Sequence, residues 1–456
     1  MVPKAVLDYI DAGQQAFVEE LLEWLRIPSV STSPAHVGDV LRAAQWVADQ
    51  AERLGFQTEV CLTPGHPLVF ADRCPHADRP TLLIYGHYDV QPSEPDGEWL
   101  TPPFSPSIRD GYVYARGASD DKGQFFTYLK AMEAILAAEG ELPLNVKLLV
   151  EGEEEIGSAS LPPFLKERTH LLKADAIAIS DGSQLNHDVP AITYGLRGLA
   201  YLQVDVQGPR FDVHSGGFGG LVANPVQALA QILSELKRPD GSVAIPGFYD
   251  DVLELTPAER QAMASLPFDE NGVKVYLGIR EFVGEEGFTL LERKAARPTL
   301  DVNGIWGGFS GEGSKTIIPA RAGAKVSMRL VPNQTTGKVN RLFRDYVLAI
   351  APRGVKVGVK ELSGADPVLV SRDHPAVQAA ARAIQFGFGK PPAFIREGGS
   401  IPVVGLFKDV LGMEAILMLG WGSPDDGAHS PNEKFNLIDF HRGMRAVAAL
   451  LYELAS

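Results

Sequence analysis

The sequence predicts an α/β protein whose chain is interrupted by a second, smaller α+β domain. Three observations lead to this prediction. Up to about residue 195, amphipathic helical segments alternate with almost continuous apolar runs, which is typical of buried strands in a sheet flanked by helices. The segments 199–206 and 322–331 instead alternate apolar with polar residues, as half-exposed strands do. After Pro367 the α/β pattern returns.

The first part of the chain alternates between the two kinds of element. Helical spacing predicts helices over 14–25, 39–54 and 122–138 and one within 161–172, and apolar runs predict strands over 81–86, 145–150 and 175–180. In sheets of this kind, ligands gather beyond the carboxyl ends of the strands. Residues that follow these strands directly are therefore candidates for a functional site.

The second part of the chain predicts a small two-layer domain. The strands expected over 199–206 and 322–331 are each followed by a predicted helix, over 223–236 and 338–349, whereas the polar, proline-punctuated segment 246–298 gives no clear pattern. The returning α/β part contributes a helix over 374–386 and a strand over 415–419. A chain of 456 residues is also too long for one ordinary core. We expect a catalytic domain formed by 1–196 and 364–456, with a second domain, 197–363, inserted into it.

Composition restricts the classes of partner. The formal net charge of −15 argues against nucleic acid and anionic membrane, which both require clustered cations. The first residues lack the succession of a secretory signal, and no apolar run is long enough to cross a bilayer. The two cysteines, Cys61 and Cys74, are too few for a disulfide framework. We expect a cytoplasmic protein.

Five short stretches place an imidazole or a carboxylate where an apolar segment ends, and they are centred on His87, Asp120, Glu153–Glu155, Asp181 and His429. Together they supply the ligands and the base that a two-metal hydrolase needs, including a carboxylate that can bridge two ions. Each also has an ordinary structural interpretation. Asp120 precedes a helix that it could cap, Asp181 begins an Asp-Gly turn, and a run of glutamates is usually a solvated surface.

The motifs around these residues resemble those of a known enzyme family. The stretches 85–92, 116–123, 151–158, 396–402 and 427–433 are similar, in this order, to motifs of the co-catalytic zinc exopeptidases. That family includes aminoacylase, glutamate carboxypeptidase, succinyl-diaminopimelate desuccinylase and the carnosine dipeptidases. The resemblance is strongest to the cytosolic nonspecific dipeptidase branch. It implies a zinc-exopeptidase-like catalytic domain with a mixed central sheet flanked by helices, and an inserted α+β lid that also dimerises.

Carried over by position, the resemblance implies a specific role for each residue. His87 and Asp181 would bind one metal ion, Glu155 and His429 the other, and Asp120 would bridge the two. Glu154 would be the general base. Asp89 would orient His87 by accepting a hydrogen bond from the ring nitrogen that does not face the metal. The ions would be zinc, although these ligands also accept manganese and cobalt.

The resemblance also implies residues that bind the substrate. His214 would reach the active site of the partner subunit and hold the substrate carbonyl, and the matched substrate-binding positions are Arg329, Thr316, Gly398, Gly399 and Ser400. Without the resemblance, His214 would be interpreted as a polar loop histidine. Arg329 is equally well explained as an outward residue of an alternating strand.

We therefore expect a homodimeric metallopeptidase that hydrolyses the amide bond of dipeptides or short peptides. Two alternatives stay open. One is an N-acyl amino acid amidohydrolase or desuccinylase that uses the same metal ions. The other, which is weaker because every matched ligand position is filled, is a metal-free binding protein on the same fold.

Overall fold

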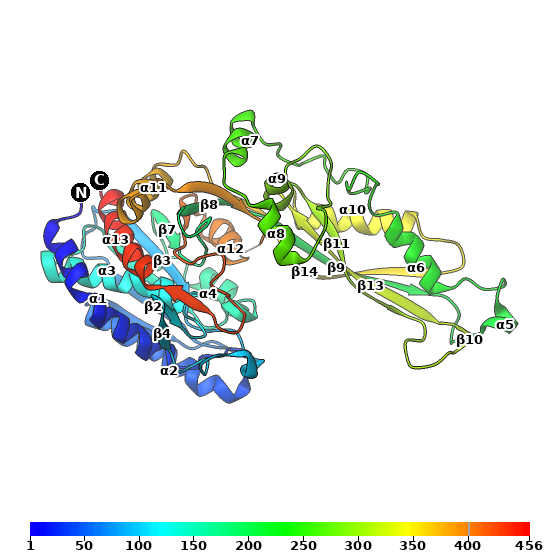
Figure 1. Ribbon diagram of the computed structural model, residues 1–456, viewed down its shortest axis with the longest axis horizontal. Coiled ribbons are helices and arrows are strands. Elements are labelled where there is room, and N and C mark those ends of the chain that lie inside the picture. The colour runs from blue at the N-terminus through cyan, green and yellow to red at the C-terminus, as the bar shows by residue number, and fades with distance from the viewer. Residues whose placement is uncertain (400–401) are drawn as a thin grey trace. The chain divides into compact units, whose positions relative to one another are not determined.

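The computed structural model describes residues 1–399 and 402–456, which form two compact units (Figure 1). The first unit comprises Met1–Tyr194, Val370–Ile395 and Leu406–Ser456, and it contains both chain termini. The second unit comprises Gly195–Leu369 and Arg396–Gly405. The α/β class with a mixed central sheet and flanking helices, which the sequence predicts, is confirmed.

The first unit is built on a mixed sheet whose central strands are parallel. Strand β3 (Thr81–His87) pairs in parallel with β6 (Asn145–Glu151) and β7 (Ala176–Ile179), and β7 pairs in parallel with β17 (Ile416–Met418). Antiparallel strands flank them: β2 (Leu68–Arg73) and β1 (Gln57–Cys61) beyond β6, and β8 (Ala191–Leu196) beyond β17. The carboxyl ends of the parallel strands therefore lie along one edge of the sheet.

Two further short strands complete this sheet where the chain passes between the units. They are β15 (Val368–Leu369) and β16 (Ala393–Glu397), which both pair with β8. A separate three-stranded sheet in the first unit contains β4 (Ser107–Arg109), β5 (Tyr112–Tyr114) and β18 (Lys434–Asn436).

Helices cover both faces of the central sheet. Successive residues of a strand point to opposite faces, so neighbouring residues of β3 contact different helices. A Cβ atom on Gly86 would meet the ring of Phe125 in α3, whereas the ring of its neighbour Tyr85 packs edge-on against Phe407 in α12. Helix α3 in turn packs against α1 and α13, and α11 packs against α13. The helices concerned are α1 (Lys4–Leu25), α2 (Val37–Arg53), α3 (Lys122–Glu139), α4 (Leu161–Glu167), α11 (Pro375–Phe388), α12 (Pro402–Leu411) and α13 (Leu437–Leu454).

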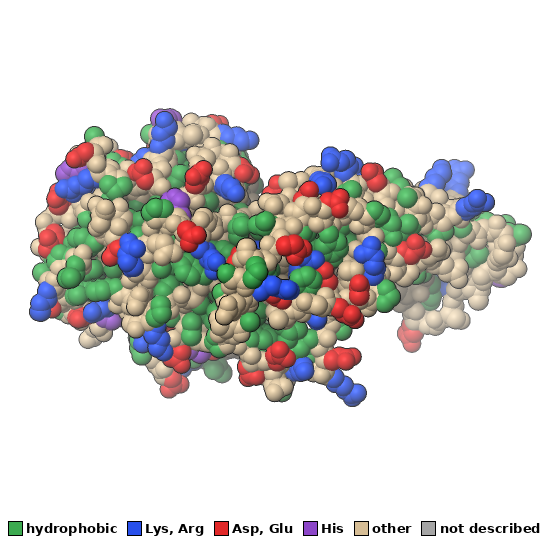
Figure 2. Space-filling model, turned by 90° about the horizontal axis from the view of Figure 1, so that it is seen from above, with side chains coloured by type: hydrophobic (Ala, Val, Ile, Leu, Met, Phe, Trp, Pro, Cys, Tyr) green, Lys and Arg blue, Asp and Glu red, His purple; other side chains and the backbone are tan. Residues whose placement is uncertain are grey.

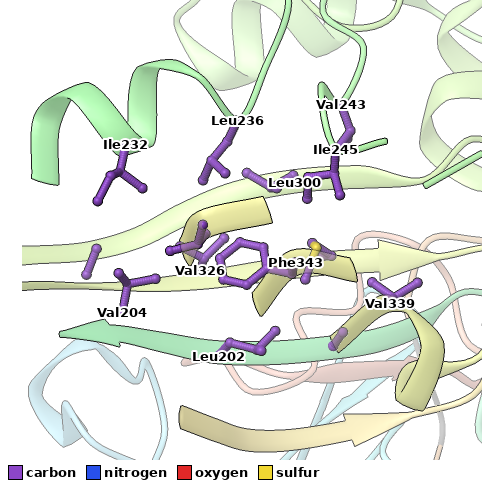
Figure 3. Packing of buried hydrophobic residues seen from close by; sticks show 14 of the residues in the cluster. Leu202, Val204, Ile232, Leu236, Val243, Ile245, Leu300, Val326, Val339 and Phe343 are labelled. Atoms are coloured by element: carbon purple, nitrogen blue, oxygen red, sulfur yellow. The ribbon is translucent and has the colours of Figure 1, made fainter. Parts of the chain in front are cut away.

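The second unit is a two-layer α+β structure. Its four-stranded antiparallel sheet has the order β11 (Thr299–Gly307), β13 (Arg321–Leu330), β9 (Gly198–Gln207) and β14 (Lys356–Ala365). Helices α6 (Pro225–Ser234) and α10 (Thr336–Ala349) pack on this sheet and bury a cluster that includes Leu202, Val326 and Phe343 (Figure 3). Alternation along β9 places its apolar residues on the buried side, as the sequence pattern predicts.

Short elements complete the second unit. Strands β10 (Val213–His214) and β12 (Ile317–Ile318) pair antiparallel, and α5 (Ser215–Phe218) directly follows β10. The segment 246–298, which gives no clear pattern in the sequence, contains α7 (Pro257–Ala264), α8 (Glu270–Leu277) and α9 (Leu290–Ala295). Capping boxes at Thr256 and Thr289 begin α7 and α9.

The surface carries charges of both signs. Figure 2 shows Lys and Arg side chains interspersed with Asp and Glu side chains over the face that it draws. Among the described residues, no helix combines the length and the apolar composition needed to cross a bilayer.

Candidate metal centre and substrate-binding residues

The loops at the carboxyl edge of the central sheet bring together all the metal ligands that the resemblance implies. Two groups of side chains have ligand atoms within 4.8 Å of one another, one of His87, Asp120 and Asp181 and the other of Asp120, Glu155 and His429. Three of these side chains are positioned by a strand end, whereas Asp120 precedes α3 and His429 lies in the loop between β17 and β18. His87 is the last residue of β3, Glu155 follows β6 in the 3-10 turn Glu154–Ile156, and Asp181 follows β7.

Asp120 belongs to both groups. Its Oδ1 lies 3.1 Å from Nε2 of His87, and its Oδ2 lies 3.0 Å from Nε2 of His429. Nε2 of His87 is also 3.9 Å from Asp181 Oδ1, and Nε2 of His429 is 3.1 Å from Glu155 Oε2. Each oxygen of one carboxylate thus faces a different imidazole, which is the arrangement of a carboxylate that bridges two ions.

The residues present fit a pair of divalent cations. Nε2 of His87 is buried and, among the described residues, makes no hydrogen bond of acceptable geometry, although Asp120 lies close to it. A buried nitrogen without a partner is costly, and a metal ion would remove that cost. Two imidazole nitrogens and three carboxylates form a donor set that suits zinc, manganese or cobalt.

The pKa shifts within the cluster also indicate that its carboxylates favour positive charge nearby. Hydrogen bonds to Asp120 and Glu155 raise the pKa of His429 to about 10. Burial lowers the pKa of His87, but the adjacent carboxylates of Asp120, Asp181 and Asp89 outweigh it and raise that pKa well above its ordinary value. Burial alone would raise the pKa of Asp120, but the two histidines bring it below its usual range. The carboxylates of this cluster thus favour positive charge beside them, which divalent cations would supply.

Glu154, the predicted general base, is partly buried beside this cluster. Burial, followed by the negative charges of Asp181, Glu155 and Asp120, raises its pKa to about 8, although His87 acts in the opposite direction. A carboxylate with a pKa in this range can accept and release a proton near neutral pH.

Asp89 is fully buried and makes more contacts than the sequence predicts. Nδ1 of His87 lies 3.1 Å from the backbone oxygen of Asp89 and 3.4 Å from its Oδ1, so the backbone carbonyl is the nearer acceptor. The carboxylate accepts hydrogen bonds from the backbone N–H groups of Glu154 and Glu155, both at 3.2 Å. Asp89 therefore supports the turn that carries these glutamates as well as the ring of His87.

Other neighbours of the site are not assigned a role by the sequence. Nε2 of Gln91 donates to Oε2 of Glu155 at 2.8 Å, and the buried Asp121 accepts a 3.3 Å hydrogen bond from the backbone N–H of His87. Gln91 lies within one of the matched motifs, and this position is the sequence feature that could have identified it as a neighbour of the site. The buried Asp121 lies next to Asp120 within another of these motifs.

The predicted substrate-binding residues belong to the second unit. His214 and Thr316 lie together, because Ser215 N–H donates to the Thr316 carbonyl at 3.0 Å and β10 pairs with β12. His214 is exposed, and its Nδ1 accepts a 2.9 Å hydrogen bond from Gly216 N–H.

The other predicted substrate-binding positions lie on β13 and after β16. Arg329 is near the end of β13, where it is opposite Leu199 of β9. Gly398 and Gly399 follow β16, and Nε of Arg197, a residue that the sequence does not single out, donates to the Gly398 carbonyl at 3.0 Å. Ser400 lies outside the described residues.

Known peptidases are similar to this chain over most of its length. A model of peptidase family M20/M25/M40 matches residues 83–453. The Cys-Gly metallodipeptidase dug1 of Schizosaccharomyces pombe is 34% identical over 465 residues, which cover 98% of this chain and 98% of that protein. The Beta-Ala-His dipeptidase of Homo sapiens is 33% identical over 468 residues, which cover 99% of this chain and 92% of that protein.

The fold is similar to solved structures along its whole length. The crystal structure of human carnosine dipeptidase 1 has a TM-score of 0.82 at 32% identity, with 100% of each chain covered. The family, the enzyme class and the dipeptidase branch that the sequence motifs predict are thereby confirmed. The chain belongs to peptidase family M20/M25/M40, as a metal-dependent peptidase of its dipeptidase branch.

Proposed function

We propose that this protein hydrolyses the peptide bond of dipeptides with two divalent cations, preferably zinc, bound at its candidate metal centre. The observation that carries the proposal is the shared carboxylate of Asp120, whose oxygens lie 3.1 Å and 3.0 Å from Nε2 of His87 and of His429. His87 and Asp181 would hold one ion, and Glu155 and His429 would hold the other.

The bound cations would supply Lewis acidity, which polarises an amide carbonyl and makes a nearby water more acidic. Side chains of the protein carry out the proton transfers. Glu154 takes a proton from the attacking water at its carboxylate and returns it to the leaving nitrogen. Burial raises its pKa, which strengthens it as a base. The carboxylate of Asp89 accepts a hydrogen bond from the backbone N–H of Glu154. This bond keeps Glu154 in place and fixes the direction of its side chain.

Groups of the second unit would bind the ends of the peptide. Arg329 and the backbone N–H groups of Gly398 and Gly399 would hold the terminal carboxylate, since a guanidinium and amide donors match its geometry. His214 would donate to the carbonyl oxygen as negative charge develops there. Thr316 lies close to His214, because β10 pairs with β12 and Ser215 N–H donates to the Thr316 carbonyl. Recognition of a free carboxylate explains why short peptides would be preferred.

The functional form would be a homodimer joined through the second unit, with His214 completing the site of the partner subunit. Strand β11, an edge strand of the four-stranded sheet, supports this because it exposes Val302, Ile305 and Trp306. An exposed apolar edge strand favours pairing with another chain. Sedimentation analysis of the purified protein would show a dimer, and a monomer at all concentrations would contradict this part of the proposal.

Metal analysis and a substrate screen test the proposal together. Plasma emission spectrometry on freshly purified protein should find two divalent ions per chain. The screen should include Cys-Gly and β-Ala-His, the dipeptides after which two relatives are named, beside N-acetyl and N-succinyl amino acids. Faster hydrolysis of the dipeptides is expected. Faster hydrolysis of the acyl amino acids would favour an amidohydrolase instead, and a metal-free protein that binds peptides without cleaving them would overturn the enzyme proposal.

A further inference from the structure

We infer that Glu433 is a positioning residue of the metal centre, because its carboxylate ties the loop that carries Asp120 to the loop that carries His429. The inference rests on the proposed two-metal function and assigns a role to a residue that this function does not use directly. Glu433 is not a member of either group of ligand atoms, so it would act through the residues that it holds.

The carboxylate of Glu433 is completely buried and bonds repeatedly to one loop. Its Oε1 accepts from the backbone N–H of Ser119 at 2.8 Å and of Asp120 at 3.1 Å. Its Oε2 accepts from the N–H of Gly117 at 2.9 Å and from Nη1 of Arg116 at 2.8 Å. The backbone carbonyl of Glu433 adds a 3.1 Å hydrogen bond from Ala115 N–H. One residue thus accepts hydrogen bonds from four backbone N–H groups of the segment that enters α3, those of Ala115, Gly117, Ser119 and Asp120.

These contacts fix the ligand that both metal groups share. Asp120 must direct Oδ1 toward His87 and Oδ2 toward His429, and each contact is about as long as an ordinary hydrogen bond, at 3.1 Å and 3.0 Å. A side chain as short as aspartate follows the orientation of its own peptide group closely. A hydrogen bond from Asp120 N–H to a buried carboxylate therefore restricts where its two oxygens can lie.

The other end of the same residue restrains the second loop. Glu433 follows His429 by four residues and leads into β18, which pairs with β5. A second link joins the two loops beside it, because the buried Asp426 accepts from Ser119 Oγ at 3.1 Å and from Ser423 N–H at 2.6 Å. The backbone carbonyl of Asp426 also accepts from Lys434 N–H at 2.9 Å. The loops of Asp120 and His429 therefore form one hydrogen-bonded body.

A purely structural ion pair with Arg116 explains these contacts less well. Buried ion pairs contribute little net stability, because desolvation offsets their attraction. Arg116 makes one of the hydrogen bonds to the carboxylate, whereas the others come from the loop that ends in the shared metal ligand. Residues that orient ligands in this way affect metal affinity as well as stability.

The full-length protein, Glu433→Gln and Glu433→Asp test the inference by metal affinity. Each protein is stripped with a chelator and titrated with Zn²⁺ against a chromophoric competitor. The glutamine variant offers one acceptor oxygen in place of two, and the aspartate variant keeps the charge but shortens the arm. Both should bind at least one ion about 10–100-fold more weakly than the wild type.

Asp439→Asn is the matched control. Asp439 is also a buried carboxylate of the first unit, it accepts from Arg442 at 3.0 Å and from Gln184 at 3.1 Å, and it touches no proposed metal ligand. This variant removes the same charge and should keep the zinc affinities of the wild type, even if its melting temperature falls.

The outcomes separate the inference from the proposed function. If Glu433→Gln binds two zinc ions with wild-type affinity, the positioning role is wrong while the two-metal proposal stands. If the wild type itself binds no zinc, the proposed function fails first. Should the Glu433 variants not fold, Ser119→Ala, which removes only the bond to Asp426, decides the question. A weaker zinc affinity in this variant supports the tether between the loops, and an unchanged affinity overturns it.

Discussion

The carboxylate of Asp89 accepts a hydrogen bond from the backbone N–H of Glu154, with 3.2 Å between Oδ1 and the nitrogen. The other carboxylate oxygen accepts from Glu155 N–H at the same distance, and Oδ1 lies 3.4 Å from Nδ1 of His87. Because Asp89 is fully buried, water does not compete for these bonds. One carboxylate thus holds a proposed metal ligand on one strand and the proposed general base on the turn beside it.

We predict that Asp89→Asn reduces kcat about 10–100-fold, because an amide offers only one oxygen to the two N–H groups of the turn. Steady-state kinetics on a dipeptide, with the metal content measured in parallel, test this. Asp175→Asn is the control, since Asp175 accepts from the backbone N–H of Thr81 at the opposite end of the same strand. Its kcat should be that of the wild type, and wild-type kcat in Asp89→Asn would show that the turn does not need this support.

Replacement of Glu154 by glutamine should separate the base from the metal ligands. We expect Glu154→Gln to bind as many metal ions as the wild type and to lose about 10²–10⁴-fold in kcat, the usual contribution of a positioned base. The assay compares single-turnover rates and metal content. Glu153→Gln is the neighbouring control, because Glu153 is buried and accepts from the N–H groups of His66 and Ser160. A fully active Glu154→Gln enzyme would refute the base assignment.

Much of the fold could be predicted because strong local patterns decide it. The helix expected over 122–138 is α3 (Lys122–Glu139), and the strand expected over 81–86 is β3 (Thr81–His87). Both are rich in apolar residues that the core buries. Helix α13 (Leu437–Leu454), which follows the last matched motif, is not among the predicted elements.

Edge strands and short strands were missed for a physical reason. Strand β14 (Lys356–Ala365) is exposed or half-exposed along its whole length, so its sequence carries little apolar signal. It is held by backbone pairing with β9, and its half-buried Val357 and Val359 pack against the core cluster. Strand β11 (Thr299–Gly307) is similarly exposed. Pairing with a distant segment leaves no local mark that a single sequence can reveal.

For the site, places at the ends of apolar segments made these residues candidates, and the family resemblance implied how the ligands are grouped. Neither could reveal what supports the ligands. The roles of Gln91 and Glu433 depend on contacts across 64 and more than 300 residues of sequence. His87 and Asp89 are two residues apart, so the sequence suggested their contact. The nearer acceptor for His87 is nevertheless the backbone carbonyl of Asp89, which no side-chain pattern encodes.

Mixed dimers should show whether His214 acts on the partner subunit. We predict that His214→Ala lowers kcat with little change in metal content, because His214 is not among the proposed ligands. A hybrid of this chain with a Glu154→Gln chain should regain activity above that of either variant alone, since one of its two sites would have both groups. Kinetics of the two variants, mixed after dissociation and reassociation, test this. Absence of any gain would place the action of His214 within its own chain.

The pH dependence of stability should reveal the buried Glu151. Burial raises the pKa of Glu151 from 4.5 to about 7, and the Tyr85 hydroxyl donates to its Oε1 at 2.6 Å. The folded state holds this proton more tightly than the unfolded state does. Protonated Glu151 therefore contributes to the free energy of unfolding, and this contribution is fully present below pH 4.5 and is lost as the pH rises through about 7. The difference between the two pKa values corresponds to at most about 3 kcal/mol.

Glu151→Gln mimics the protonated side chain and should therefore gain stability over the wild type as the pH rises. Urea unfolding of chelator-treated protein at pH 5, 6, 7 and 8 measures the gap, that is, the free energy of unfolding of the variant minus that of the wild type. This gap should be small at pH 5 and largest at pH 8. Glu141→Gln is the control, because Arg79 lowers the pKa of this exposed glutamate and any gap must then have the opposite sign. A gap for Glu151→Gln that stays constant across this range would mean that Glu151 is already ionised at pH 5 in the folded protein.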